Sequence, residues 1–264
     1  MSENTKQIPH APMPTLVHCG HHKCLTVFVD RCFQKVLGGH FRNFFQDAAG
    51  FYEEHQRYAV TQTSDFLPDF SRLGDYKISR FIRDPRDLIV SGYFYHRRGS
   101  EAWTNQPRDQ WRWQNVPRAM RADETYAQLL QRVDQEDGLI AEMEFRAPHF
   151  ESMLCWPADD PRVKTWKYED IIGREVEVMD AVGEHYGWLD DDDPFTLRAA
   201  LRHFANRWKA NDTLRAWDKH VRDPRPGQWR DVFTPKVQAV FAARFPDLIE
   251  TLGYEPIARS RRTA

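Results

Sequence analysis

The segment HCGHHKCLT (residues 18–26) contains residue types that suit two different kinds of site. Histidine and cysteine are common zinc ligands, whereas a glycine followed by a lysine and a threonine is typical of a loop that binds phosphate or sulfate. A structural zinc site usually needs a second close pair of ligands. The other cysteines, Cys32 and Cys155, stand alone, and no CxxC pair occurs. We therefore favour the anion-binding loop and expect no metal ion.

The residues on either side of this loop predict a strand before it and a helix after it. TLVHCG (15–20) is a short apolar run, and from Leu25 to Leu37 apolar residues recur at a helical period, up to Gly38. A helix N-terminus presents unpaired N–H groups and the positive end of the helix dipole. Lys23 adds a charge there and Thr26 a hydroxyl. The loop does not match GxxxxGK[ST], which argues against a nucleoside triphosphatase.

Two further segments carry arginines that could bind the same anion. RDPRDLIVS (83–91) follows a predicted strand at 76–82 and places Ser91 two helical turns beyond Arg83. A later basic segment contains Arg222, Arg225 and Gly227 between prolines. A guanidinium group binds phosphate through paired N–H groups. Alternatively, the first segment is an ordinary ion-paired helix cap and the second a solvated loop.

The order of elements predicts the fold class. Strand candidates at 15–20, 76–82 and 162–170 alternate with helix candidates, which indicates an α/β fold with a central parallel sheet flanked by helices. We expect one domain over residues 1–264, with its core at about 15–254. Further helices are expected at 123–155, with breaks near Gly138 and Pro148, and at 174–187, 194–208 and after Thr234-Pro235. Residues 98–122 are expected to form a long loop.

Charge and composition limit the partners and the compartment. The formal net charge is −2, so no global basic field attracts nucleic acid or a membrane surface. No run of 18 apolar residues occurs, the first residues lack the apolar core of a signal peptide, and the four cysteines form no regular framework. We expect a cytoplasmic protein with reduced thiols, bound to neither nucleic acid nor membrane.

Together these segments resemble the sulfotransferases that use 3′-phosphoadenosine 5′-phosphosulfate (PAPS). That family has a lysine-containing loop after its first strand and an R-[DN]-P-x-D-x-x-x-S motif, which RDPRDLIVS matches. KYEDII (167–172) is similar to its YED strand end and RHFANR (202–207) to a helix segment that carries a phenylalanine. Gly227-Gln228-Trp229, Phe233-Thr234 and the final LGY correspond to its C-terminal part. The resemblance covers about residues 15–254.

The resemblance implies a P-loop-like sulfotransferase fold and a role for each matching position. Lys23 and Thr26, with the loop residues His21, His22, Cys24, Leu25 and Val27, would hold the 5′-phosphosulfate. The 3′-phosphate would be bound by Arg83, Ser91 and Arg222, close to Gly227, and Tyr168 and Phe204 would line the adenine. PAPS would be the donor and PAP the product, without a metal. The acceptor would be a small molecule or carbohydrate with a hydroxyl or an amine. The oligomeric state stays open.

The sequence departs from the family pattern at the loop and at the catalytic base. Leu25 and Val27 replace the family's usual glycine and threonine. Asp65-Phe66 replaces the histidine that precedes a Leu-Pro pair, so we take Asp65 or His40 as the candidate base. Other residues also stay open for this role: Asp47, Glu53, Glu54 and His55. The loop at 98–122 is a possible acceptor site, and its tryptophans 103, 111 and 113 could stack on a ring or cover the core.

Two other functions remain as alternatives. One is a magnesium-dependent phosphotransferase that uses ATP. The other is a non-catalytic module that binds an anion, a nucleotide or zinc through HCGHHKC.

Overall fold

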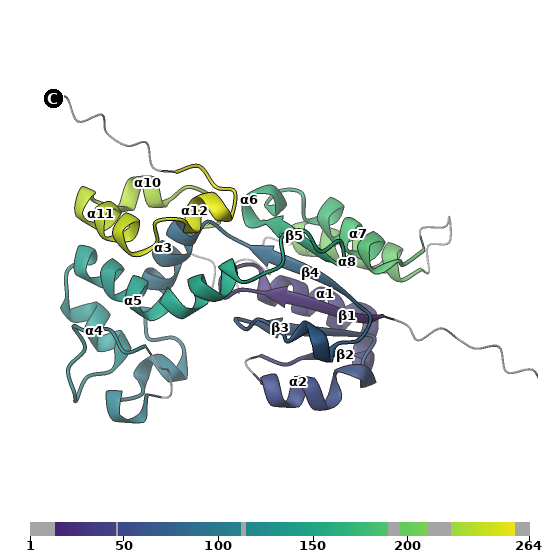
Figure 1. Cartoon of the computed structure of the whole chain (residues 1–264), viewed down its shortest axis with the longest axis horizontal. Coiled ribbons are helices and arrows are strands. Elements are labelled where there is room, and N and C mark those ends of the chain that lie inside the picture. Colours follow the sequence, from purple (N-terminus) through teal and green to yellow (C-terminus); the bar gives the residue numbers. More distant parts are fainter. Residues whose placement is uncertain (1–13, 46, 112–114, 190–195, 211–222, 257–264) are drawn as a thin grey trace, which may run out of the picture.

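The computed structural model describes residues 14–45, 47–111, 115–189, 196–210 and 223–256 (Figure 1). Within them a five-stranded parallel sheet has the order β2-β3-β1-β4-β5. β1 (Thr15–Gly20) is central, between β3 (Val60–Ser64) and β4 (Tyr76–Ile82), and β2 (Phe41–Asn43) and β5 (Val163–Lys167) are the edges. The expected α/β fold with a central parallel sheet is confirmed. Because the strands are parallel, their carboxyl ends meet along one edge.

Helices cover both faces of the sheet. α1 (Thr26–Leu37), α7 (Glu175–Tyr186) and α8 (Leu197–Ala210) lie on one side, and α2 (Ala48–Glu54) lies on the other (Figure 1). The apolar side chains separate accordingly. Phe28 and Phe33 of α1 belong to the large core, whereas Phe51 of α2 packs with Val17 and Ile78 in a second cluster.

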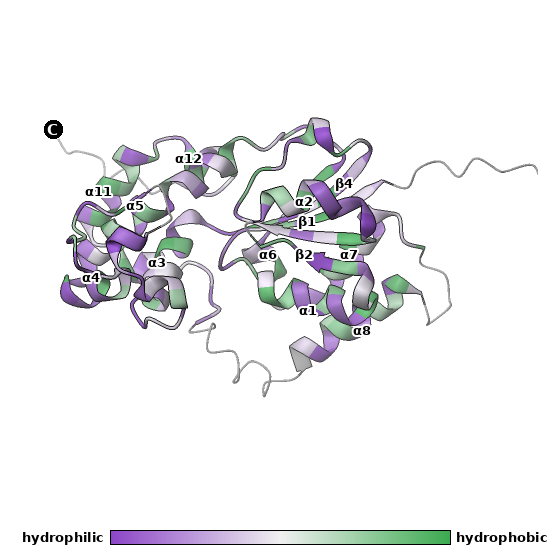
Figure 2. Ribbon diagram, turned by 90° about the horizontal axis from the view of Figure 1, so that it is seen from below, coloured by the Kyte–Doolittle hydropathy of each residue, from purple (hydrophilic) through white to green (hydrophobic). Residues whose placement is uncertain are grey.

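The other helices gather beyond the carboxyl end of β4. α3 (Pro85–His96) leads into α4 (Tyr126–Arg132) and α5 (Gln135–Leu154), and α10 (Trp229–Val232), α11 (Pro235–Arg244) and α12 (Leu248–Thr251) pack beside them (Figures 1 and 2). α6 (Tyr168–Ile171) directly follows β5. No helix in the described ranges is long and apolar enough to cross a membrane.

Most predicted elements are present, with shifted ends. The strands at 15–20 and 76–82 are confirmed, and the third strand ends at Lys167 because α6 begins there. The chain also forms β2, β3 and α2, which the sequence did not indicate. β3 is polar but fully buried: Thr61 donates to the Leu16 carbonyl and Gln62 to the Thr26 carbonyl. A strand whose buried side chains are polar has no hydrophobic alternation to detect.

The predicted breaks in the helix at 123–155 are wrong. The chain breaks between α4 and α5 instead, where Asp134 caps α5 by accepting from the Asp137 N–H. Gly138 lies in the first turn, and a Cβ there would come within 2.4 Å of the Tyr93 ring, so glycine allows close packing on α3. Pro148 cannot donate to the Glu144 carbonyl. Asn115 Nδ2 donates to that carbonyl at 3.1 Å, so the helix continues.

Asn115→Ala should destabilise the fold by about 1–3 kcal/mol, because it leaves the Glu144 carbonyl next to Pro148 without a donor. Urea unfolding followed by circular dichroism measures this change. Gln110→Ala, at an exposed site in the same loop, is the control and should change the free energy of unfolding by less than about 0.5 kcal/mol. Equal stability of the two variants would show that another group satisfies the carbonyl.

Candidate functional site

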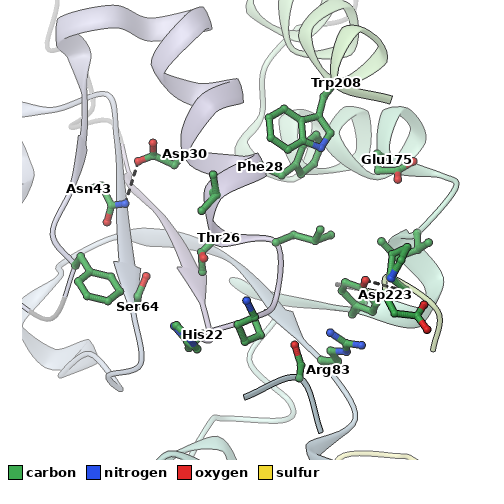
Figure 3. Close-up of a pocket in the computed structure, with 18 of the residues that line it drawn as sticks. His22, Thr26, Phe28, Asp30, Asn43, Ser64, Arg83, Glu175, Trp208 and Asp223 are labelled. Atoms are coloured by element: carbon green, nitrogen blue, oxygen red, sulfur yellow. Dashed lines mark hydrogen bonds between the residues drawn. The ribbon is translucent and has the colours of Figure 1, made fainter. Parts of the chain in front are cut away.

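A cavity of about 310 Å³ opens at the carboxyl edge of the sheet, where β1 turns into α1. Figure 3 shows Thr26 and His22 between Asn43 and Ser64 on one side and Arg83 and Asp223 on the other. Predicted site residues that line it are His22, Lys23, Leu25, Thr26, Val27, Arg83, Ser91 and Tyr168. The structure therefore brings together the loop after β1 and the RDPRD motif, which are sixty residues apart in the sequence.

The turn from β1 into α1 depends on a close approach between two residues. A Cβ at Gly20 would come within 2.7 Å of the Thr26 Cγ2 atom. Within the turn, Lys23 and Leu25 have positive φ angles of 67° and 64°. A left-handed non-glycine residue costs roughly 1–2 kcal/mol, so the loop is locally strained. Leu25 thus occupies the position of the family's glycine in a conformation that glycine adopts readily.

The amino end of α1 has no anionic cap of its own. Leu25 is the N-cap and makes no side-chain cap hydrogen bond, and the first turn contains no acidic residue. The first N–H groups of an α-helix have no partner within the helix, and the dipole favours negative charge there. The helix end therefore suits an anion supplied by a ligand.

Not every residue of the predicted anion-binding loop is able to bind the anion. The His22 N–H already donates to Asp65 Oδ1 at 2.8 Å, and the Cys24 N–H to the His21 carbonyl. His21 and the Cys24 side chain are buried behind the loop and do not line the cavity. The loop residues that can still bind an anion are therefore Lys23 and those at the start of α1. Lys23 Nζ lies 3.7 Å from the centre of the Tyr95 ring.

The arginine of RDPRD that faces the cavity is Arg83. Only 3% of its surface is exposed, and its Nε and Nη2 atoms make no hydrogen bond to the described residues. Its guanidinium carbon lies 4.1 Å from the centre of the Tyr168 ring, and Nη2 is 4.0 Å from Asp87 Oδ2. Ser91, two turns along α3, lines the same cavity. A buried cation with unmade hydrogen bonds calls for an anionic ligand.

The rest of the motif is structural. Arg86 forms a bidentate pair with Asp84 and stacks on Trp229. Asp87 accepts the N–H groups of Gly227 and Trp229, at 2.6 and 2.9 Å. These contacts attach the C-terminal segment to the start of α3. Gly227 therefore supports the site without lining it, while Asp223 and Pro224 line the cavity. Arg222 lies outside the described residues.

The aromatic side chains of Tyr168, Phe28 and Trp208 also line the cavity. Tyr168 donates from its hydroxyl to the Pro224 carbonyl, and Trp208 packs against Phe28 with ring centres 5.8 Å apart (Figure 3). Phe204, which the resemblance assigns to the adenine site, does not line this cavity. Trp208, one helical turn further along α8, lines it instead.

The sequence did not indicate several residues that line the cavity. Ser64 ends β3 beside Gly20, and its buried hydroxyl has no partner in the described part of the chain. Asn43 ends β2 and donates to Asp30 of α1 (Figure 3). Both strands were missed, so the polar residues at their carboxyl ends were missed with them. Only the general rule that parallel strands end at the site could have indicated them.

Of the two candidate bases, the structure brings only Asp65 close to the site. Asp65 lines a smaller cavity of about 60 Å³ with His22, Glu101 and His149. Burial alone would raise its pKa, but His149, Arg146, His21 and the His22 N–H together lower the pKa of Asp65. His40 is exposed and directly precedes the first residue of β2. It therefore lies at the amino ends of the strands, whereas the cavity lies at their carboxyl ends. The other open candidates, Asp47, Glu53, Glu54 and His55, line neither cavity.

The cysteines of HCGHHKC do not converge on one point. Cys19 packs in the cluster beneath α2, and Cys24 packs in the large core on the other face. Burial raises the pKa of Cys19 to about 12 and also raises the pKa of Cys24. The cysteine-based zinc alternative is not supported by this geometry.

The predicted acceptor loop reaches the site through two residues. Glu101 lines both cavities and Trp103 lines the smaller one. Trp111 packs against the core, and Trp113 lies outside the described residues. Part of the loop therefore lines the two cavities, and another part covers the core.

Comparison with known proteins gives matches among solved structures alone. Neither a family model nor a curated protein matches the sequence. Mouse sulfotransferase SULT7A1 complexed with PAP matches with a TM-score of 0.57 at 17% identity, over 90% of this chain and 86% of that one. Retinol dehydratase with retinol and PAP matches at 0.54 and 14%, over 90% and 82%. The same enzyme with androsterone and inactive cofactor PAP matches at 0.50 and 15%, over 90% and 81%.

The chain has the sulfotransferase fold. The cavity lies at the turn after β1 and is lined by Lys23, Thr26, Arg83, Ser91 and Tyr168, among others.

Gly20→Ala should destabilise the sulfotransferase fold by about 1–3 kcal/mol, because the new methyl group would clash with Thr26 Cγ2. Thr26→Ser removes that methyl and keeps the hydroxyl. The double variant should therefore recover at least about 0.5 kcal/mol relative to the sum of the single changes. Urea unfolding of all four proteins measures the coupling. Strict additivity would mean that the clash lies elsewhere.

Proposed function

We propose that this protein is a PAPS-dependent sulfotransferase that transfers a sulfuryl group to a hydroxyl or amine of a small-molecule or carbohydrate acceptor. The observation that carries the proposal is Arg83. Its buried guanidinium has two nitrogens without a hydrogen bond to the described residues, and it lies at the wall of a cavity that begins at the amino end of α1. Two separate cationic sites suit a ligand with phosphate groups at both ends, as in PAPS.

The 5′-phosphosulfate would lie against the amino end of α1. Thr26 supplies a hydroxyl and Lys23 a positive charge in the same loop, and Ser64 adds a hydroxyl from the end of β3. The carboxylates nearby are already engaged: Asp30 accepts from Asn43, and Glu101 accepts from Tyr95 and Trp103. These hydrogen bonds orient the two carboxylates but do not neutralise them, so Lys23 and the amino end of α1 would supply the attraction for the anion.

The 3′-phosphate would bind Arg83 and Ser91, and Arg222 is proposed as a further ligand by the resemblance alone. Arg83 is held in place by its stacking on Tyr168 and by Asp87. Adenine would then lie between Tyr168 and the wall formed by Phe28 and Trp208. In this arrangement Trp208 takes the role that the sequence assigned to Phe204.

The transfer itself needs positioning and charge stabilisation. The acceptor oxygen or nitrogen forms a bond to sulfur while the bond from sulfur to the bridging phosphate oxygen breaks, and that oxygen keeps the electron pair as PAP leaves. Lys23 would stabilise the negative charge that grows on it. The acceptor proton passes to a base, for which Asp65 and the neighbouring His149 are the candidates at the smaller cavity.

Arg83→Met should weaken binding of 3′,5′-phosphoadenosine by about 10- to 100-fold, because charge-assisted hydrogen bonds contribute about 1.5–3 kcal/mol. Binding of 5′-AMP, which lacks the 3′-phosphate, should change much less. Isothermal titration calorimetry with both nucleotides measures the difference. Arg118→Met removes a surface arginine and is the control for both.

An equal loss of affinity for both nucleotides would remove the 3′-phosphate assignment. Tight binding of ATP with magnesium, without binding of 3′,5′-phosphoadenosine, would replace the proposal with the phosphotransferase alternative.

Lys23→Met should lower the transfer rate by about 10²- to 10³-fold, the usual effect of removing one group that stabilises transition-state charge. The assay follows sulfur-labelled PAPS into a mixture of phenols, alcohols, amines and simple sugars. Lys35→Met, at the exposed far end of α1, is the matched control. Unchanged transfer in Lys23→Met would rule out its catalytic role.

A further inference from the structure

Three side chains that could ligate a metal meet beside the loop, at a position separate from the cysteines. They are His22 of the loop, His96 at the last position of α3, and Glu101 five residues later. One ligand atom from each lies within 4.8 Å of the other two. We propose that His22, His96 and Glu101 bind a divalent transition-metal ion of the zinc class.

We assign Nε2 as the ligand atom of each histidine. Glu142 Oε2 accepts from His96 Nδ1 at 2.8 Å, which leaves the lone pair on Nε2. His22 Nε2 is buried and has no hydrogen-bond partner among the described residues. The rings are stacked with centres 5.6 Å apart. Both rings are buried or half-buried, beside the cavities.

The supporting contacts are those that metal sites use to orient their ligands. A ligand histidine usually donates its other N–H to a carboxylate. Here that carboxylate, Glu142, is itself held by the Tyr126 hydroxyl at 2.6 Å and by Arg146 Nε at 3.1 Å. Glu101 is oriented by the Tyr95 hydroxyl at 3.0 Å and by the Trp103 indole. Both carboxylates therefore lie in defined positions.

Charged groups of both signs surround the three side chains. Glu142, Glu101 and Asp65 supply three carboxylates, against the two cationic side chains Lys23 and Arg146. Arg146 is the opposing contact, since its Nη2 lies 3.5 Å from His96 Nε2. Metal binding would require Arg146 to give up this long contact while keeping its bond to Glu142.

Two histidines and one glutamate are a ligand set of catalytic zinc sites, in which a fourth position stays open. Ligand atoms around a tetrahedral zinc ion lie about 3.4 Å apart, so the three groups need to approach one another by roughly 1 Å. His22 and Glu101 line both cavities, so the open position would face the candidate acceptor space. An acceptor hydroxyl bound there would ionise more easily than in water; that role rests on the proposed function, whereas ion binding does not.

The test uses the full-length protein, stripped of metal with a chelator and without nucleotide. Titration with Zn²⁺ by calorimetry should give one site per chain, and Co²⁺ should give the visible absorption of a tetrahedral or five-coordinate ion. Glu101→Gln removes the charge, keeps an oxygen that can accept from the Trp103 indole, and turns its amide NH2 toward the Tyr95 hydroxyl, which can accept. It should weaken Zn²⁺ binding at least about tenfold. His96→Asn should also weaken Zn²⁺ binding at least about tenfold. His96 is buried, so if the His96→Asn variant does not fold, the result for Glu101→Gln tests the proposal.

The controls separate this site from other metal-binding groups. His203→Asn, on the exposed face of α8, and Cys155→Ser, at the exposed thiol, should leave Zn²⁺ affinity unchanged. Absence of saturable Zn²⁺ binding, equal affinity in Glu101→Gln, or loss of binding in Cys155→Ser would each overturn the proposal. Binding of 3′,5′-phosphoadenosine to the metal-free protein is measured in parallel, so that failure of the proposed function is distinguished from failure of the metal site.

Discussion

The contact of Thr26 with Gly20 sets the position of the amino end of α1, and the rest of the site depends on it. The central strand ends at Gly20, and six residues later the chain is helical and packed back onto the strand end. So tight a reversal requires left-handed conformations at Lys23 and Leu25. Its result is an uncapped helix end that points at the cavity, with Lys23 and Thr26 on its rim.

The buried charged residues of RDPRD have two different roles, one structural and one in ligand binding. Within RDPRD, Asp84 and Arg86 neutralise one another, and Asp87 accepts backbone N–H groups from the C-terminal segment. Arg83 differs from them because its nearest carboxylate oxygen is 4.0 Å away. Burying a cation without close partners is costly, and a ligand that recovers this cost binds correspondingly well.

A polar network behind the loop connects three elements that are distant in sequence. Glu142 of α5 links His96 of α3, Tyr126 of α4 and Arg146 of its own helix, and His96 stacks on His22 of the loop. The helices beyond the sheet thereby support the same loop from which α1 begins. Movement of α5 against α3 would change both the loop and the smaller cavity, since His22, Arg146 and His149 line that cavity together.

The sequence by itself determined the parts whose signals are local. The apolar run at 15–20, the period that begins near Leu25, and the spacing of Arg83 and Ser91 predicted β1, α1 and much of the cavity wall, because strand, helix and cap preferences act over a few residues. Only the tertiary structure decided the rest. β3 is buried although polar, α5 passes Pro148 because Asn115 reaches its free carbonyl, and Trp208 rather than Phe204 faces the cavity. His22, His96 and Glu101 meet only after α3 has packed on α5, since contacts between distant segments leave no periodic trace in the sequence.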